Sequence, residues 1–216
     1  MQTLEKMTIG EYVAKDFRTA AVFSKYGIDF CCKGNRTIEE ACEKKDIDTD
    51  QLMDQLNTVL STKNDSAIDF KSWPLDLLAD YIEKTHHRYV QEKTQVILPF
   101  LDKLCKVHGA NHPELFEINE LFIGCAGELA QHLIKEEQIL FPFVKKMVKA
   151  SLANEGIAQP QFGTVNNPIA MMMEEHEAEG DRFVKIAELT NNYTPPADAC
   201  STYRVTFAML SDFEQD

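Results

Sequence analysis

The sequence has few basic residues to set against its acidic ones. Its 216 residues include 22 Lys and Arg but 35 Asp and Glu, which gives a formal net charge of −13 at pH 7. No long basic run interrupts this acidic excess. Nucleic acids and anionic membrane surfaces attract positive charge, so such a chain is repelled by both. We therefore expect no nucleic-acid partner.

Long apolar runs are also missing. Glu5, Glu11 and Asp16 interrupt the beginning of the chain, so no secretory signal peptide is recognisable there. No stretch approaches the ~18 apolar residues that a membrane-spanning helix requires. The sequence therefore predicts a cytoplasmic protein with no membrane partner.

Cysteine is too scarce for a disulfide framework, because the six residues are widely scattered. Four stand singly in helical-looking segments, where a thiol usually acts as a small buried hydrophobe: Cys42, Cys105, Cys125 and Cys200. Cys31 and Cys32 are adjacent, a geometry that fits a mutual disulfide badly. Lys33, Arg36 and a helix start at Thr37 should lower the pKa of these two thiols and favour metal, nitric oxide or redox chemistry. Small residues in a tight turn are the alternative interpretation.

Helical periodicity dominates the chain and strict apolar–polar alternation is almost absent, so the sequence predicts an all-α fold. Thr8-Ile-Gly-Glu11 and Thr37-Ile-Glu-Glu40 have the form of capping boxes, and each should begin a short helix. A third short helix should follow Asp48. The polar run Ser61-Thr-Lys-Asn-Asp-Ser66 then reads as a linker. We predict a small helical N-terminal domain at residues 1–65 and a second domain at residues 66–216.

The second domain is predicted to contain four longer helices. The signals place them at about residues 74–107, 113–150 and 167–190, and from residue 197 onward. Long helices joined by short connections favour an antiparallel four-helix bundle.

Polar residues interrupt the apolar stripes of three of these helices. In the second helix the stripe runs Ile118, Phe122, Cys125, Leu129, His132, Glu136, Ile139 and Phe143. His132 and Glu136 therefore occupy core positions one turn apart. His176 takes a core position in the third helix. In the first helix, His86 lies inside the apolar arc and His87 towards its edge.

Three inward histidines and one carboxylate form a nitrogen and oxygen ligand set suited to iron, manganese or zinc. A ferritin-like site would need two Glu-x-x-His segments, and only Glu83-x-x-His86 has that form. His132-x-x-x-Glu136 instead resembles a histidine-rich di-iron site of the hemerythrin type. The alternative is a bundle stabilised by buried polar pairs, but the stripes offer too few inward carboxylates for that.

Several segments together resemble the di-iron (RIC) family of iron-sulfur cluster repair proteins, which has a hemerythrin-like domain and an N-terminal double-cysteine domain. The matching segments are His132-Leu-Ile-Lys-Glu136-Glu-Gln-Ile-Leu-Phe-Pro142, Asp29-Phe-Cys-Cys-Lys-Gly34, Ser72-Trp-Pro-Leu75, Met173-Glu-Glu-His176-Glu-Ala-Glu-Gly180 and Asn191-Asn-Tyr-Thr-Pro-Pro196. The resemblance covers nearly the whole chain.

The resemblance implies a non-haem di-iron centre with four ligands in this sequence. His87, His132 and His176 would bind iron, and Glu136 would bridge the two irons. His86 is kept as an alternative ligand, or as a residue that supports the ligands from outside, because the apolar stripe favours it. The resemblance also implies thiol chemistry or domain association for the cysteine pair.

Two features depart from the family pattern. The family's fourth helix carries a further histidine and bridging glutamate in a His-x-x-x-Glu segment, which this sequence lacks. Its fourth apolar stripe still continues near Asp216, so we expect a truncated fourth helix and a weaker or mononuclear metal site. The second departure is Lys33, which replaces the first glycine of the family's Cys-Cys-Gly-Gly.

The function implied by the resemblance is repair of iron-sulfur clusters damaged by nitric oxide or by oxidative stress. Iron donation and nitric oxide handling both fit the residues, and a repair or iron-donor factor fits better than an enzyme. The expected partners are damaged iron-sulfur proteins, with nitric oxide or dioxygen as a small ligand, and a homodimer is plausible. The alternatives are a hemerythrin-like oxygen, nitric oxide or iron sensor without repair activity, and a helical scaffold without metal.

Overall fold

The computed structural model describes residues 7–30, 34–61 and 69–216. The chain divides into two compact units, Met1–Trp73 and Pro74–Asp216. Among the described residues, the only extended pairing is an isolated antiparallel bridge between Thr8 and Thr37. The predicted all-α fold is therefore confirmed. The predicted boundary at residues 65 and 66 lies outside the described residues.

The described part of the first unit contains four short helices: α1 (Ile9–Lys15), α2 (Thr19–Lys25), α3 (Ile38–Lys45) and α4 (Thr49–Ser61). Both predicted capping boxes are present, with Thr8 and Glu11 at α1 and Thr37 and Glu40 at α3. Helix α2 was not predicted. It has seven residues and begins after Arg18 without any side-chain cap, so the usual start signal is missing.

The N-termini of α1 and α3 are joined by backbone hydrogen bonds. The amide of Ile9 donates to the carbonyl of Arg36 at 2.9 Å, and the amide of Gly10 donates to the carbonyl of Gly34 at 2.7 Å. A Cβ at Gly34 would lie 2.2 Å from the carbonyl oxygen of Phe30. Position 34, two residues after Cys32, therefore accepts only glycine without a backbone shift.

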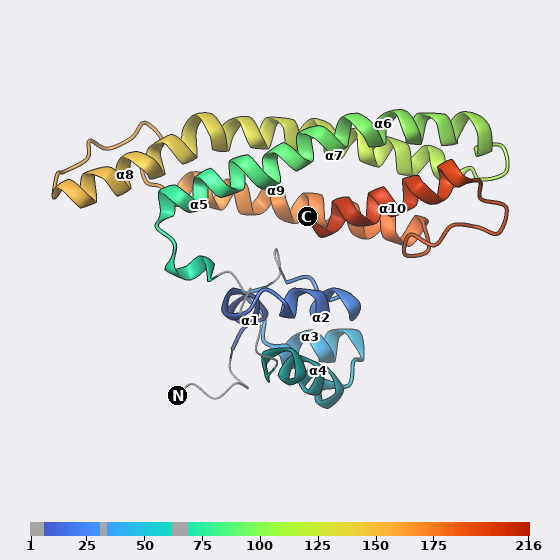
Figure 1. Ribbon diagram of the computed structural model, residues 1–216, viewed down its shortest axis with the longest axis horizontal. Helices are drawn as coiled ribbons and strands as arrows, with labels where there is room; N and C mark the ends of the chain where they lie inside the picture. The colour runs from blue at the N-terminus through green and yellow to red at the C-terminus, as the bar shows by residue number, and fades with distance from the viewer. Residues whose placement is uncertain (1–6, 31–33, 62–68) are drawn as a thin grey trace. The chain divides into compact units, whose positions relative to one another are not determined.

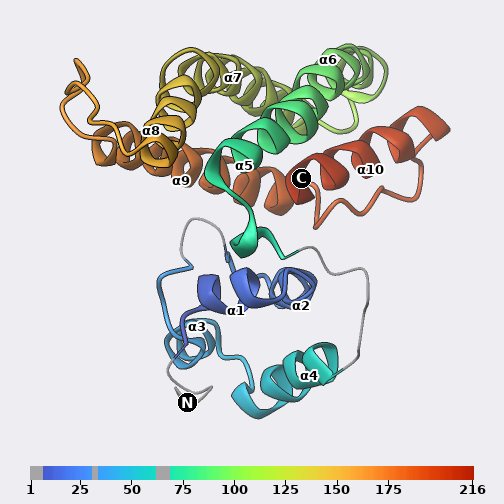
Figure 2. The ribbon, with the colours of Figure 1, turned by 60° about the vertical axis from the view of Figure 1, so that its left-hand side comes forward.

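The second unit is an antiparallel bundle, shown in Figures 1 and 2. Its helical segments are α5 (Leu75–Ile82), α6 (Arg88–His108), α7 (Glu114–Lys135), α8 (Phe141–Ala153), α9 (Asn166–Leu189) and α10 (Ser201–Gln215). Segments α5 and α6 form one continuous helix, and α7 and α8 form another. With α9 and α10 they make the predicted four-helix bundle, which is confirmed.

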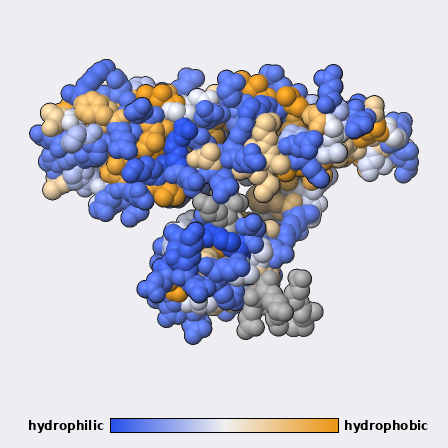
Figure 3. Space-filling view, turned by 180° about the vertical axis from the view of Figure 1, so that it is seen from behind, coloured by the Kyte–Doolittle hydropathy of each residue, from blue (hydrophilic) through white to orange (hydrophobic). Residues whose placement is uncertain are grey.

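A single apolar cluster joins α6, α7, α9 and α10. Its buried residues are Ile97, Leu101, Leu104, Cys105, Leu115, Ile118, Phe122, Cys125, Phe183, Ile186, Tyr203, Phe207, Leu210 and Phe213. Each such apolar side chain contributes about 1.5–3 kcal/mol on burial. Outside this core, hydrophilic and hydrophobic residues are interspersed on the face that Figure 3 shows. Among the described residues, no helix combines the length and apolar character needed to cross a bilayer.

Both continuous helices are interrupted by one wide π-helical turn. These turns are Glu83–His87, between α5 and α6, and Glu136–Leu140, between α7 and α8. Pro142 follows the second turn; it lacks an N–H, and its ring conflicts with the carbonyl four residues earlier in a regular α-helix. A π-turn adds a residue to the turn and so rotates all later side chains around the helix.

We predict that Gly34→Ala destabilises the first unit by about 1–3 kcal/mol, because the new methyl group meets a backbone carbonyl that cannot move alone. Chemical denaturation followed by circular dichroism measures the change. The contrasting variant is Gly127→Ala on α7, where a Cβ meets nothing within 4 Å. This variant should instead stabilise the bundle by about 0.5–1 kcal/mol. Equal stability of Gly34→Ala and the unchanged protein would contradict the packing argument.

Candidate metal centre

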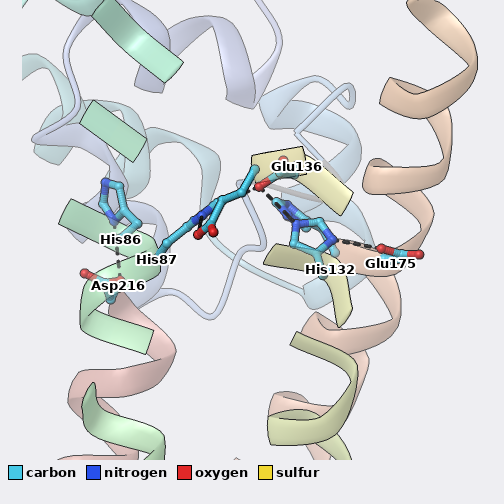
Figure 4. A network of polar contacts seen from close by, with 8 residues as sticks. His86, His87, His132, Glu136, Glu175 and Asp216 are labelled. Atoms are coloured by element: carbon cyan, nitrogen blue, oxygen red, sulfur yellow. Dashed lines mark hydrogen bonds and ion pairs between the residues drawn. The ribbon is translucent and has the colours of Figure 1, made fainter. Parts of the chain in front are cut away.

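Three helices bring a histidine to one place in the bundle. His87 ends the π-turn before α6, His132 lies one turn before the end of α7, and His176 lies in the middle of α9. Glu136 begins the π-turn that follows α7. His87 and His132 are each 4% exposed, Glu136 is half-buried, and His176 is exposed. Figure 4 shows the carboxylate of Glu136 between the rings of His87 and His132.

The imidazole Nε2 atoms converge on this carboxylate. Glu136 Oε2 lies 2.9 Å from His87 Nε2 and 3.5 Å from His132 Nε2. His132 Nε2 in turn lies 2.9 Å from His176 Nε2. The ligand atoms of His132, Glu136 and His176 all lie within 4.8 Å of one another. Nitrogen and carboxylate donors so arranged fit a first-row transition metal.

In His87 and His132, the second ring nitrogen, Nδ1, contacts a further carboxylate. Glu137 Oε1 lies 2.9 Å from His87 Nδ1, and Glu175 Oε2 lies 2.8 Å from His132 Nδ1. Lys135 contacts the second oxygen of Glu175. A carboxylate at Nδ1 fixes the proton on that nitrogen and leaves Nε2 free for a metal, as in carboxylate–histidine–metal triads.

Sequence reasoning missed Glu137 and Glu175. Each directly follows or precedes a predicted ligand, so the pairs Glu136-Glu137 and Glu175-His176 were the available signal. The argument that the histidines lack carboxylate partners was therefore wrong. Simple polar pairing still leaves His176 unexplained, because its Nε2 faces another ring nitrogen rather than a carboxylate.

The electrostatics of the centre favour a cation. Burial opposes ionisation of Glu136, but hydrogen bonds from His132 and His87 outweigh it and lower its pKa to about 2. Burial also disfavours the charged rings of His87 and His132, yet their carboxylate partners raise the pKa of both. Although part of the His176 residue is exposed, desolvation of its ring and the charge of His132 together lower its pKa. These opposite shifts favour His132 as the donor and His176 as the acceptor in the contact between their Nε2 atoms.

The apolar stripe placed His86 nearer to the core than His87, and the structure shows the opposite. His87 is buried, whereas the His86 ring lies at the surface with Nδ1 3.3 Å from Asp216 Oδ2, away from Glu136 (Figure 4). The stripe assumed 3.6 residues per turn throughout. The π-turn Glu83–His87 adds a residue at this point, which brings His87 inward instead.

The cysteines are divided between core and surface. Cys42, Cys105 and Cys125 are buried free thiols, as predicted. Cys200 is exposed, and the prediction that it is a small buried hydrophobe is wrong. It precedes the first residue of α10 rather than lying within a helix, so helical periodicity does not apply to it. Cys31 and Cys32 lie outside the described residues.

Comparison with known proteins agrees with this geometry. Residues 78–216 match the family described as "Hemerythrin HHE cation binding domain", and residues 5–60 match a family described as "Domain of Unknown function (DUF542)". An iron-sulfur cluster repair protein ScdA of Staphylococcus haemolyticus is 30% identical over 96% of this chain and 89% of its own length. An iron-sulfur cluster repair protein YtfE of Yersinia pestis is 31% identical over 92% of this chain and 84% of its own length.

The chain belongs to the family of iron-sulfur cluster repair proteins with a hemerythrin HHE domain. The bundle is thus a cation-binding domain of the hemerythrin type, and its His and Glu cluster is the candidate site for that cation. The described residues fit such a group, because two imidazole nitrogens contact one ionised carboxylate and the third, from His176, lies 2.9 Å from the His132 nitrogen. The family match extends beyond the bundle into the first unit.

We predict that Glu175→Gln weakens metal binding by about 10–100-fold, because the amide no longer fixes the proton on His132 Nδ1. Anaerobic titration with Fe²⁺ against a chromogenic chelator measures the affinity. The matched control is Glu174→Gln, which removes the same charge from an exposed neighbour on α9. Equal affinity of the two variants would show that Glu175 acts only through its charge.

Proposed function

We propose that this protein repairs iron-sulfur clusters damaged by nitric oxide or oxidative stress, using a non-haem iron centre at His87, His132, Glu136 and His176. The observation that carries the proposal is the grouping of three imidazole nitrogens and one carboxylate inside a hemerythrin-type bundle. The relatives named as iron-sulfur cluster repair proteins supply the biological role. A metal-free helical scaffold would not need three histidines and a carboxylate at one place.

The position of Glu136 supports a bridging role for its carboxylate. His87 approaches it from the helix formed by α5 and α6, while His132 and His176 lie on its other side, on α7 and α9. Ring nitrogens that reach one carboxylate from separate helices support this role, which we propose for Glu136. Helix α10 contains no histidine, so these four residues are the ligands we propose from the described bundle.

Iron bound at this centre would supply a site for nitric oxide or dioxygen and a source of iron for a damaged cluster. The protein's own residues suit the binding of a cation. Glu136 is ionised, and its Oε2 contacts the rings of His87 and His132, so its negative charge is compensated inside the bundle. Iron donation and nitric oxide handling both remain within this proposal. We propose damaged iron-sulfur proteins as the partners of the bundle, and the homodimer stays a prediction.

The adjacent histidines give a sharp test of the ligand assignment. We predict that His87→Ala loses most of the iron bound by anaerobically purified protein, whereas His86→Ala keeps it. The reason is that His87 Nε2 points at Glu136 while the His86 ring contacts Asp216. Iron counted per chain by elemental analysis is the measurement. Iron loss in His86→Ala alone would reverse the assignment.

The repair role needs a separate assay. We expect iron-loaded protein to restore the activity of a dehydratase whose [4Fe–4S] cluster has been destroyed by nitric oxide, and His87→Ala to fail. The double variant Cys31→Ser and Cys32→Ser tests the thiols, and recovery equal to that of the unchanged protein would remove them from the mechanism. If loaded protein binds nitric oxide but restores no activity, the alternative of a hemerythrin-like binding or sensing protein is the better account.

A further inference from the structure

A second group of titratable side chains lies at the end of the bundle where α6 ends and α10 begins. It consists of His108, His112, Asp198 and Cys200, with Glu114 beside His112. His108 follows His87 by 21 residues along α6, so the group is about 30 Å from the metal centre at about 1.5 Å per residue. The proposed iron centre uses none of these residues.

Cys200 and His108 form a close thiol–imidazole pair. Cys200 Sγ lies 3.3 Å from His108 Nε2, and Cys200 is exposed. The His108 ring packs edge-on against Tyr203, with 5.3 Å between ring centroids, and Tyr203 is only 1% exposed. Because Tyr203 is fixed in the core, it holds the imidazole in position facing the thiol. This is the nucleophile–base geometry used in thiol chemistry.

The second histidine of the group, His112, has carboxylate partners at both ring nitrogens. His112 Nε2 lies 3.1 Å from both carboxylate oxygens of Asp198, and His112 Nδ1 lies 3.1 Å from Glu114 Oε1. His112 is therefore paired with Asp198, the acid nearest to Cys200 in the chain. Among the described residues, the His132, Glu136 and His176 cluster is the only one with three mutually close ligand atoms. The group around Cys200 thus lacks the convergence of a metal site.

Cys200 also differs from the other described cysteines in acidity. The backbone N–H of Tyr203 and the ring of His108 lower the pKa of Cys200 to about 7. Burial instead raises the pKa of Cys42, Cys105 and Cys125. A thiol whose pKa is close to the ambient pH is the most effective attacking group in thiol–disulfide exchange, because it is substantially ionised and still strongly nucleophilic.

We propose that Cys200 is a nucleophilic thiol that is reversibly modified by low-molecular-weight disulfides, with His108 as its partner. The Cys200 thiolate attacks one sulfur of the disulfide and forms a mixed disulfide while the original S–S bond breaks. The departing thiolate takes a proton from the His108 imidazolium. The Cys200 sulfur is oxidised and the departing half of the disulfide is reduced, so the disulfide itself is the oxidant.

The test uses the full chain with Cys31→Ser and Cys32→Ser as the background, which leaves Cys200 as the exposed thiol among the remaining four. Two probes are used: 5,5′-dithiobis(2-nitrobenzoate) for rates and glutathione disulfide for the product. We expect one fast-reacting thiol with a pH–rate midpoint near 7, and a mixed disulfide that mass spectrometry locates on Cys200. Cys200→Ser should abolish the fast phase.

His108→Gln should move the midpoint towards the ordinary cysteine value of about 8.5. The lower thiolate fraction is partly offset by higher intrinsic nucleophilicity, so the rate at pH 7 should fall by about three-fold, with a larger fall at pH 6. The matched control is His112→Gln, which removes an imidazole bonded to Asp198 and Glu114 rather than to the thiol and should leave the midpoint near 7.

Two results would overturn the proposal. One is a fast phase that survives Cys200→Ser, and the other is a His108→Gln midpoint equal to that of the background protein. Thermal unfolding followed by circular dichroism is measured on every variant. Should His108→Gln lower the melting temperature, the more conservative His108→Asn is used for the same midpoint comparison.

Discussion

Glu136 is an ionised carboxylate inside a helical bundle, and the rest of the centre is arranged around its charge. Taking such a group out of water costs several kcal/mol even after the protein relaxes. His87 and His132 offset this cost, with ring nitrogens 2.9 and 3.5 Å from one carboxylate oxygen. The two rings come from different helices. They therefore offset the cost of burying the Glu136 charge only while those helices keep their positions relative to each other.

That register comes from apolar packing rather than from the centre. Phe213 on α10 packs against Phe122 on α7 and Phe183 on α9, with ring centroids 5.3 and 5.8 Å apart. Each such buried side chain stabilises the fold by about 1.5–3 kcal/mol. A buried ion pair contributes close to nothing net, although breaking one by removing a single partner is costly. The core therefore positions the residues of the candidate centre.

The two π-turns show how a bundle of helices can present ligands that a regular helix would not. Each lies beside a residue of the centre, with His87 at the end of one turn and Glu136 at the start of the other. Widened turns of this kind are uncommon and are frequent at functional sites. In this protein they rotate the following helix segments so that apolar residues still face the core on both sides of the polar centre. Phe141, stacked on His87 with ring centroids 5.5 Å apart, illustrates this arrangement.

The sequence by itself determined the helical fold, both capping boxes of the first unit, and the grouping of His132, Glu136 and His176 on neighbouring helices. These features are local: caps and stripes depend on residues three or four apart along one helix. Two further features, the resemblance to the repair family and the choice of His87 over His86, depended on motifs rather than on periodicity.

Only the tertiary structure decided the contacts that join distant segments. The π-turn at Glu83–His87 changes the helical phase by one residue, which periodicity cannot reveal in advance. Glu137 and Glu175 orient rings that stand 50 and 43 residues away in the sequence, and Cys200 meets His108 across 92 residues. Such pairings depend on how α6, α7, α9 and α10 pack side by side. A stripe on a single helix holds no information about which residue the neighbouring helix places opposite it.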